Sequence, residues 1–481
     1  MKECWSTYGT DLHLELDPAT GRRVGLEQAL RGAIRAGRLA PDSRLPATRK
    51  LAAELGLSRG TVKAAYDQLA AEGYLTALQG SGTVVARLPQ PQPTARTRVG
   101  SQDHALVTLP PAVPGGIPDV PRHDLRPGSP DVSGFPATAW LRATGRALNS
   151  APAGAFGYGD PRGSVELRVA LAEYLGRTRG VLARPAQIVI TSGYVQALAL
   201  LTGALGAGSR PVTAMEDPGL GYHREVVRRA GSAVVPLPVD DRGARTDLLS
   251  TPGFPQVDAV VLTPAHQYPT GVTMDPPRRR TLIDWARSSG GLIVEDDYDG
   301  EFRYDRQPVG ALQGMAPDQV AYLGTASKTL GPALRLGWMV LPERLVEPVV
   351  EAKLYHDHHT ELIGQLALAE LITGHAYDRH IRGCRLRYRR RRDLLVQRIG
   401  SRFPVQGIAA GLHALVGLDQ GGPGEQEILD RAAARQLAVG HLGNHWHHPG
   451  GRPQGIIVGY GTPHERAYEA AVDALVQTLH A

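Results

Sequence analysis

The chain has 481 residues, a hydrophobic content of 42%, a charged content of 21% and a formal net charge of +6. This length exceeds one ordinary core, so we expect two or more domains. The composition is that of a globular protein, and no apolar run has membrane-spanning length. Cys4 and Cys384 are too few and too far apart for a disulfide framework, and the N-terminus lacks an apolar signal core. We therefore expect reduced thiols, no membrane partner and a cytoplasmic location.

The first predicted elements are helices. Residues 20–36 place apolar side chains at helical spacing. A shorter helix is predicted over 48–55, with Thr48 capping its start and Gly56 its end. A tight turn then leads to another helix that begins near Arg59. Two helices joined by a short turn are typical of a helix-turn-helix.

A hairpin is predicted next, because two short β-branched runs within residues 74–86 flank a glycine-rich tip that begins at Gln79. A hairpin that follows a helix-turn-helix is a wing. The polar residues at the start of the preceding helix lie off its apolar face, where a recognition helix meets bases and phosphates. These residues are Ser58, Arg59, Gly60, Thr61 and Lys63. The alternative is a helical interaction domain without a role in DNA binding.

The stretch LPATRKLAAELGLSRGTVKAAYDQLAAEGYLTALQGSGTVVA closely resembles the GntR-type winged helix of bacterial transcription factors, within a domain that covers residues 8–87. The resemblance implies that the domain binds double-stranded operator DNA. Together with Lys63, which the helix start contributes, the DNA-binding residues are predicted to be Arg49, Ser58, Arg59, Thr61, Gln79 and Gly80. Residues 88–123 are rich in proline and glycine and predict a linker, either a simple tether or a reach toward a neighbouring subunit.

From residue 124 onward, short β-rich runs alternate with helical stretches. This alternation predicts a mostly parallel sheet with helices on both faces. Ligands in such sheets bind beyond the carboxyl ends of the strands. The candidate strands are residues 187–191, 211–216, 233–239, 259–264, 292–298, 320–326 and 337–342.

Lys328 follows the strand at 320–326 in a turn of small residues. A lysine becomes a carbonyl-trapping nucleophile when desolvation lowers its pKa. The hydroxyls of Thr325 and Ser327 and the cation of Arg335 suit a phosphate. A lysine that forms a Schiff base, together with a phosphate clamp, is what a pyridoxal 5'-phosphate (PLP) site needs. The same segment alone fits a surface lysine equally well.

Further candidate residues for PLP follow other strands. The backbone amides at the start of the helix after 187–191 can bind a phosphate, which selects Gly193, Tyr194 and Val195. Asp296 can keep the pyridine nitrogen protonated, and Tyr298 can bond the phenolic oxygen. An ordinary βα turn and a magnesium site are the alternatives to these assignments. The acidic cluster that would hold magnesium is Glu295, Asp296, Asp297 and Asp299.

An effector pocket is predicted around the same strand ends. Tyr222 can stack on a planar ring and Arg224 can hold a carboxylate. Polar groups that precede a Pro-Thr-Gly turn, on His266, Gln267 and Tyr268, can line a ligand. Histidines also cluster within 356–359 and 441–448, but without cysteine partners or a zinc spacing, so no metal is predicted.

The words YGDPRGSVELRVALAEYL, TSGYVQAL, HQYPTG, EDDYDGEFRY and GTASKTLGPALRLGW occur in the order of a fold-type I aminotransferase, over residues 124–481. Joined to the N-terminal domain, they resemble the MocR subgroup of GntR-type regulators, which includes PdxR-like and GabR-like proteins. The resemblance implies a winged helix-turn-helix plus an α/β aminotransferase-like domain, with a mostly parallel seven-stranded sheet and a smaller C-terminal α/β subdomain. It also implies a domain-swapped homodimer and a Schiff base between Lys328 and PLP.

The sequence departs from the aminotransferase pattern at the substrate side. Tyr268 stands where asparagine usually precedes Pro-Thr-Gly, and Gly455 stands near the expected substrate-carboxylate arginine, with Arg452 the nearest substitute. We therefore predict a transcription regulator that senses PLP, or an amine or amino acid that reacts with its PLP. One alternative is a working aminotransferase that carries a DNA-binding domain. Another is a DNA-binding protein whose second domain is a dimerisation scaffold.

Overall fold

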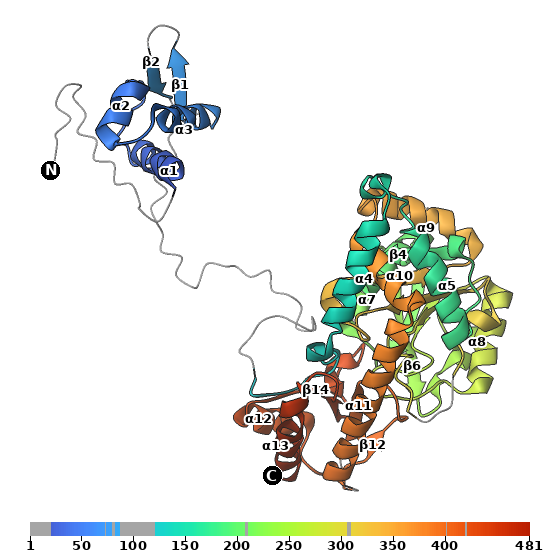
Figure 1. Cartoon of the computed structure of the whole chain (residues 1–481). Helices are drawn as coiled ribbons and strands as arrows, with labels where there is room; N and C mark the ends of the chain where they lie inside the picture. The colour runs from blue at the N-terminus through green and yellow to red at the C-terminus, as the bar shows by residue number, and fades with distance from the viewer. Residues whose placement is uncertain are drawn as a thin grey trace. The chain divides into compact units, whose positions relative to one another are not determined.

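The computed structural model describes residues 21–72, 74–78, 82–86, 121–206, 210–304, 309–400, 402–418 and 421–481. The chain divides into two compact units, residues 1–106 and residues 107–481 (Figure 1). The predicted wing-tip contacts Gln79 and Gly80 and most of the predicted linker lie outside the described residues. Within the described ranges, no helix is both long enough and apolar enough to cross a membrane.

The first unit is built on three helices and a hairpin. The helices are α1 (Arg22–Arg35), α2 (Thr48–Leu55) and α3 (Arg59–Ala71), and the antiparallel strands are β1 (Leu75–Leu78) and β2 (Gly82–Val85). Their apolar faces meet in one core, in which Leu26, Leu30, Val62 and Leu69 are fully buried. The chain before α2 also pairs with the hairpin, since the Leu45 amide donates to the Thr83 carbonyl at 2.9 Å.

Of the two caps predicted for α2, the one at its end is present and the one at its start is not. Gly56 ends α2 in the left-handed conformation, with φ of 64°. The Ser58 hydroxyl starts α3 by accepting the Thr61 amide at 3.0 Å. The predicted cap at Thr48 is wrong: Ala47 is the capping residue, without a side-chain hydrogen bond. Thr48 already has a helical backbone, so its hydroxyl is not placed to accept an amide of the first turn.

The second unit contains an eight-stranded sheet in the order β4-β11-β10-β9-β8-β5-β6-β7. Strands β4 (Ile188–Thr191), β5 (Val212–Asp217), β6 (Ala233–Asp240), β8 (Ala259–Leu262), β9 (Leu292–Asp296) and β10 (Val320–Thr325) run in one direction, and β11 (Gly337–Val340) runs against its neighbours. The seven predicted strands are all present. The eighth, β7 (Gly243–Ala244), is a two-residue edge strand antiparallel to β6, too short to show a sequence pattern.

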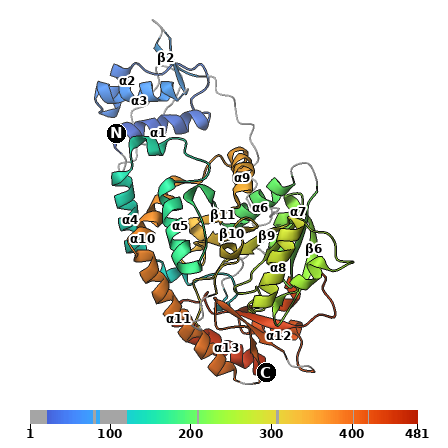
Figure 2. The ribbon, with the colours of Figure 1, turned by 90° about the vertical axis from the view of Figure 1, so that its right-hand side faces the viewer.

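Apolar side chains alternate between the two faces of this sheet, as period-two strands require. Leu292 and Val294 of β9 pack with α6 (Tyr194–Leu205), α7 (Gly221–Arg229) and α9 (Glu343–His356), whereas Ile293 packs with α8 (Pro276–Ser289). Around β4 and β11, the face shared with α8 is covered by α4 (Ala137–Ser150), α5 (Val165–Arg179) and α10 (Leu362–Thr373). Figure 2 shows β9, β10 and β11 side by side among these helices.

A smaller five-stranded sheet, in the order β12-β13-β15-β14-β3, forms the C-terminal subdomain. Four strands come from the end of the chain: β12 (Val405–Gln406), β13 (His413–Gly417), β14 (Leu437–His441) and β15 (Gly455–Gly459). The fifth, β3 (His123–Leu125), comes from the start of the unit and pairs parallel to β14. Helices α11 (Ala376–Ile399), α12 (Glu425–Ala434) and α13 (Tyr468–His480) pack against this sheet. Because of this pairing, the segment 126–129, which follows β3, comes close to the larger sheet although it precedes every strand of that sheet in the sequence.

Candidate functional site

The carboxyl ends of the parallel strands meet at one edge of the large sheet. Strand β9 ends at Asp296, β10 at Thr325 and β8 just before Thr263. A cavity of about 300 Å³ opens there. Its lining includes eleven of the predicted PLP and effector residues, namely Tyr194, Val195, Tyr222, Arg224, Tyr268, Asp296, Tyr298, Thr325, Ser327, Lys328 and Arg335. The predicted residues Gly193, His266, Gln267 and Arg452 are not in the lining.

Lys328 lies in the turn between β10 and the antiparallel strand β11. Its ammonium donates a hydrogen bond to the Gly128 carbonyl, which belongs to the segment after β3. Desolvation lowers the pKa of Lys328, and the negative charges of Asp296 and Asp299 oppose this shift. A lysine of lowered pKa has a larger neutral fraction, which is the nucleophilic form.

Asp296 closes β9 and is 6% exposed. Within the described part of the chain, its Oδ1 atom has no hydrogen-bond partner. Burial raises the pKa of Asp296 well above its ordinary value, and the nearby Tyr194 hydroxyl opposes this shift although its oxygen does not reach hydrogen-bond geometry. A buried carboxyl oxygen without a donor is costly. A ligand with a cationic N–H group at this position would remove that cost.

Arg335 faces the start of α6. Its guanidinium lies so near Gly193 that a Cβ atom there would be 3.1 Å from Nη1 and Nη2, and Gly193 has a φ of 99°. Glycine thus lets the cation approach the free amides at the helix start, which already favour an anion. The Thr325 hydroxyl donates to Ser327 Oγ at 2.9 Å beside this helix end. Arg335 forms no ion pair with any described residue. This arrangement suits a phosphate group.

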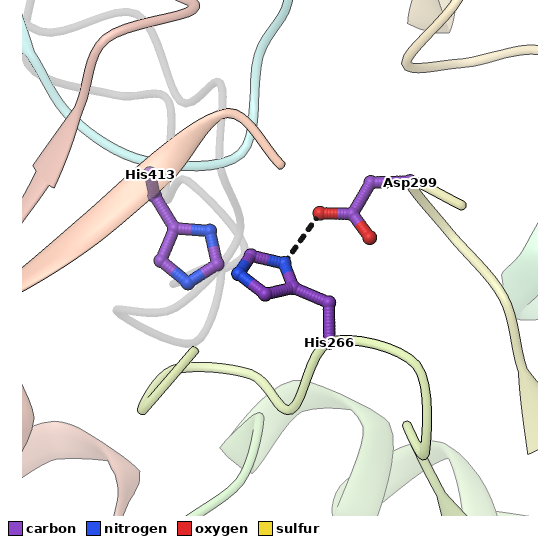
Figure 3. A group of neighbouring side chains, drawn as sticks. All are labelled: His266, Asp299 and His413. Carbon is purple, nitrogen blue, oxygen red and sulfur yellow. Dashed lines mark hydrogen bonds and ion pairs between the residues drawn. The ribbon is translucent and has the colours of Figure 1, made fainter. Parts of the chain in front are cut away.

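Tyr298 lies in the turn after β9, two residues beyond the end of the strand that was predicted to include it. Its hydroxyl donates to the His266 carbonyl and lies 3.1 Å from both that oxygen and His266 Nδ1. His266 Nδ1 in turn lies 2.7 Å from Asp299 Oδ2 (Figure 3). The predicted contact of Tyr298 with a phenolic oxygen therefore competes with a contact to His266.

A group of metal-type ligands was not foreseen. His266, Asp299 and His413 are all buried and place ligand atoms within 4.8 Å of one another (Figure 3). The acidic cluster considered for magnesium is instead divided among separate partners. Glu295 accepts the Leu312 and Gln313 amides, and Asp297 pairs with Arg179 at 2.6 Å.

The two arginines predicted for an effector carboxylate have other partners. Arg224 is buried and donates to the carbonyl oxygens of Gly219 and His445, both at 2.9 Å, and of Trp446 at 3.1 Å. Arg452 lies outside the cavity lining, 3.9 Å from Asp217 Oδ2 and over the Trp446 ring. The Gln267 side-chain amide also has partners within the protein, because it donates to Glu216 and to the Pro218 and Tyr268 carbonyls.

Several lining residues were missed by sequence reasoning. Glu216 ends a predicted strand, and burial raises its pKa to about 7. His223 packs 4.6 Å from the Tyr194 ring, and burial beside Lys328 lowers its pKa to about 3. Glu216 is the next-to-last residue of β5 and His223 lies in α7, which follows β5, so both were accessible to the strand-end rule. His413 and the segment 127–129 were not, because they reach the cavity through the small sheet.

The helix-turn-helix presents a second candidate surface. Arg49 on α2 and Arg59 at the start of α3 are exposed and form no ion pair with described residues. Lys63 is exposed but pairs with Asp67 at 2.6 Å. The Ser58 and Thr61 hydroxyls lie 2.8 Å apart and help to start the helix. Of the predicted DNA contacts that the structure describes, the two arginines are therefore exposed cations without an ion-pair partner.

Comparisons with known proteins agree with the division of the chain into a helix-turn-helix unit and a unit built on the large sheet. Residues 23–85 match the model for bacterial regulatory proteins of the gntR family, and residues 126–439 match that for aminotransferase class I and II. The chain is 30% identical to the HTH-type pyridoxine biosynthesis transcriptional regulator PdxR of Corynebacterium glutamicum, over 95% of this chain and 96% of that protein. It is 33% identical to the probable rhizopine catabolism regulatory protein MocR of Rhizobium meliloti, over 96% of this chain and 95% of that protein.

Among solved structures, kynurenine aminotransferase of Pyrococcus horikoshii, determined in complex with PMP, superposes with a TM-score of 0.67 and 26% identity. The match covers 74% of this chain and 90% of that one. PLP is the cofactor that this aminotransferase fold takes. The residues here fit it: Lys328 offers a desolvated amine, and Asp296 offers a buried oxygen and Arg335 a cation at a helix start, neither of which has a partner for that group among the described residues.

Proposed function

We propose that this chain, which belongs to the family of GntR-type helix-turn-helix transcription regulators that carry an aminotransferase class I and II domain, binds operator DNA in a way that depends on PLP in its cavity. The observation that carries the proposal is the cavity beside Lys328. Its groups fit a cofactor, while no described cation in it is left for a substrate carboxylate. We place the DNA-binding domain at residues 8–87, the linker at 88–123 and the PLP-binding domain at 124–481.

When bound, PLP supplies an aldehyde that combines with amines and a pyridine ring that withdraws electrons. Lys328 would hold the aldehyde carbon, and Asp296 would accept the ring N–H. The phosphate would be held by Arg335, by the hydroxyls of Thr325 and Ser327, and by the amides of Gly193, Tyr194 and Val195. Tyr222 would cover one face of the ring, and Tyr298 would face its phenolic oxygen.

The effector is proposed to be PLP itself, or an amine that combines with bound PLP. Coupling requires that the effector bind two states of the protein with different affinity. His266, Gln267, Tyr268, Arg224 and Arg452 were expected to form the effector pocket. Since Arg224 holds three backbone carbonyls and Arg452 lies outside the lining, an amino-acid carboxylate has no ready partner. This supports PLP or a carboxylate-free amine over an amino acid.

The partners proposed for the whole protein are operator DNA and a second copy of the chain. DNA contacts would come from Arg49, Ser58, Arg59, Thr61 and Lys63, together with Gln79 and Gly80. A domain-swapped homodimer in the cytoplasm would present two winged helices to a two-fold operator. Large apolar side chains are exposed on the second unit, among them Leu141, Phe156, Tyr158 and Tyr355, and a partner subunit would cover them.

The second candidate function is a working aminotransferase with a DNA-binding domain. It is supported by the desolvated Lys328 and by the fold shared with kynurenine aminotransferase. Single-turnover reaction of the PLP-loaded protein with a panel of amino acids distinguishes the two. Rapid, complete conversion with release of keto acid would favour the enzyme.

The proposal is tested by a DNA-shift assay on the region upstream of the protein's own coding sequence, with and without PLP. PLP should change the apparent affinity of the wild-type protein but not that of Lys328→Ala. Arg59→Ala should weaken binding under both conditions, by about 1–3 kcal/mol if it contacts a base. If PLP leaves binding unchanged both alone and with amines, the PLP-responsive function is wrong.

A further inference from the structure

We infer that a second cavity, formed between the end of α5, the first turns of α11 and residues 300–301, binds the phosphate groups of a small phosphorylated molecule. This cavity has a volume of about 500 Å³. It shares no lining residue with the cavity beside Lys328. The inference therefore goes beyond the proposed function and does not depend on PLP.

Arginines from two helices line this cavity. Helix α11 contributes Arg379, Arg382 and Arg385, which recur every three residues and therefore lie on successive turns. The end of α5 contributes Arg177. A fifth arginine, Arg179, is buried and already has a carboxylate partner at 2.6 Å. Four guanidinium groups thus remain to be accounted for.

Described residues do not neutralise the three arginines of α11. Arg382 is exposed and forms neither a hydrogen bond nor an ion pair with any of them. Arg379 and Arg385 donate to backbone carbonyls, of Gly374 at 3.4 Å and of Glu301 at 2.9 Å, and have no ion-pair partner in the described part of the chain. Like charges on one wall of a cavity repel one another, so this wall favours an anion.

The two carboxyl groups of the lining do not supply that anion. Asp378 pairs with Arg177 at 2.9 Å and lies 3.3 Å from His375 Nδ1. Burial raises the pKa of Glu301 to about 7, so a large fraction of this carboxyl group is protonated at neutral pH. Its Oε1 atom accepts the Tyr174 hydroxyl at 3.4 Å. The positive charge of the α11 wall is therefore left for a ligand.

The arrangement favours phosphate over carboxylate. A guanidinium group binds two oxygens of an anion through a pair of parallel N–H groups. A carboxylate has two oxygens and serves one such pair, whereas a phosphate group has three free oxygens and about two negative charges, so several arginines can share it. The cavity volume of about 500 Å³ lies in the range of sites that enclose small ligands. Cations that face a concave site suit such a ligand better than they suit the backbone of a DNA duplex.

The experiment titrates the full-length protein, in the presence of PLP, with pyrophosphate and with citrate, and measures binding by calorimetry. Pyrophosphate should bind with a dissociation constant below about 1 mM, and more tightly than citrate. Arg382→Ala should weaken its binding about tenfold, because hydrogen bonds to a charged group are lost. Arg382→Lys, which keeps the charge but not the paired N–H groups, should weaken it less. Arg390→Ala is the matched control, because it removes an exposed arginine of α11 that lies outside the lining, and it should leave the affinity unchanged.

Several results would overturn the inference. Equal losses in Arg382→Ala and Arg390→Ala would mean that pyrophosphate responds only to the general positive charge of α11. Tighter binding of citrate would assign the site to a carboxylate ligand, and displacement of pyrophosphate by a short DNA duplex of unrelated sequence would assign it to nucleic acid. Absence of pyrophosphate binding at about 1 mM would leave no anion site. Since Arg382 has no described partner, the variants should unfold at the wild-type temperature, which separates loss of binding from loss of the fold.

Discussion

At the scale of single residues, two buried carboxyl groups determine what the cavity accepts. Asp296 ends β9 with an oxygen that lacks a partner among the described residues, and Glu216 is the next-to-last residue of β5, before Asp217. Glu216 differs because its Oε2 accepts the Thr263 amide and hydroxyl and the Gln267 side chain. The Asp296 oxygen is therefore available to a ligand, whereas the hydrogen bonds of the Glu216 carboxyl group are made by the protein itself.

Asp296→Asn should weaken PLP binding by about ten- to a hundredfold, because a hydrogen bond to a charged group contributes about 1.5–3 kcal/mol. The same change should raise or preserve the melting temperature without PLP, since an unpaired buried carboxyl is removed. PLP titration and thermal unfolding, each with and without cofactor, measure the two effects. Loss of stability without PLP, at unchanged affinity, would show that Asp296 has a structural role instead.

Glu216→Gln should change how stability depends on pH. The pKa of Glu216 is raised from 4.5 to about 7, so the folded protein holds a proton that the unfolded chain has released. This stabilises the fold below pH 4.5, and the contribution is lost as pH rises through 7, up to about 3 kcal/mol in all. Urea unfolding at pH 5 and pH 8 should show a smaller loss of stability for Glu216→Gln than for the wild-type protein. Parallel pH profiles would contradict this assignment.

At the scale of elements, the start of α6 is shaped by a glycine rather than by a capping side chain. Gly193 precedes the helix without a side-chain cap, and its positive φ and missing Cβ admit the Arg335 guanidinium. In α3 the same task of satisfying free amides falls to Ser58. The contrast indicates that the α6 amides are left for a ligand.

Gly193→Ala should weaken PLP binding and destabilise the protein by about 1–3 kcal/mol, because the backbone is left-handed and the new methyl meets Arg335. Gly203→Ala within the same helix is the matched control. A Cβ atom there meets nothing within 4 Å, so stability should stay equal or rise by up to about 1 kcal/mol. Thermal unfolding and PLP titration of both variants check this. Equal behaviour of the two variants would remove the special role of Gly193.

At the scale of the whole PLP-binding unit, the residues at its start are fixed by contacts with its C-terminal part. Strand β3 pairs with β14, and the Thr462 hydroxyl donates to the Arg126 carbonyl at 2.5 Å. Asp131 and Arg391 form a buried ion pair of 2.8 Å. The segment between these anchors supplies Gly128, whose carbonyl accepts the Lys328 ammonium. Folding of the small sheet is therefore a condition for completing the cavity.

Asp131→Ala should destabilise the protein by about 3–5 kcal/mol, because it removes the 2.8 Å partner of the buried Arg391 charge and leaves only the exposed Glu465 carboxylate, 3.7 Å away. It should also weaken PLP binding, since residues 127–129 line the cavity. Asp473→Ala is the matched control. It breaks the exposed ion pair between Asp473 and Arg398, an arginine that lies on α11 as Arg391 does, and should cost no more than about 1 kcal/mol of stability. Chemical unfolding of both variants checks the difference. Similar costs would mean that burial of the pair is not what stabilises this end of the chain.

Local sequence patterns predicted most of the fold. All seven predicted strands of the large sheet are present, because apolar, β-branched runs between helical stretches are visible within a few residues. The strand predicted over 292–298 ended early, at Asp296, because the acidic residues after it turn toward separate partners. The cap predicted at Thr48 failed by one residue, which is the usual precision of helix ends.

The sequence by itself determined the winged helix, the α/β sheet and the group of Lys328, Asp296 and Arg335, because strand order and the strand-end rule bring these residues together. Tertiary structure decided the rest. Gly128 and Lys328 are 200 residues apart, and Arg224 has its guanidinium occupied by carbonyls more than 200 residues later in the chain. His413 enters the cavity only because the small sheet packs beside the large one. Such partners depend on contacts between distant segments, which no local pattern records.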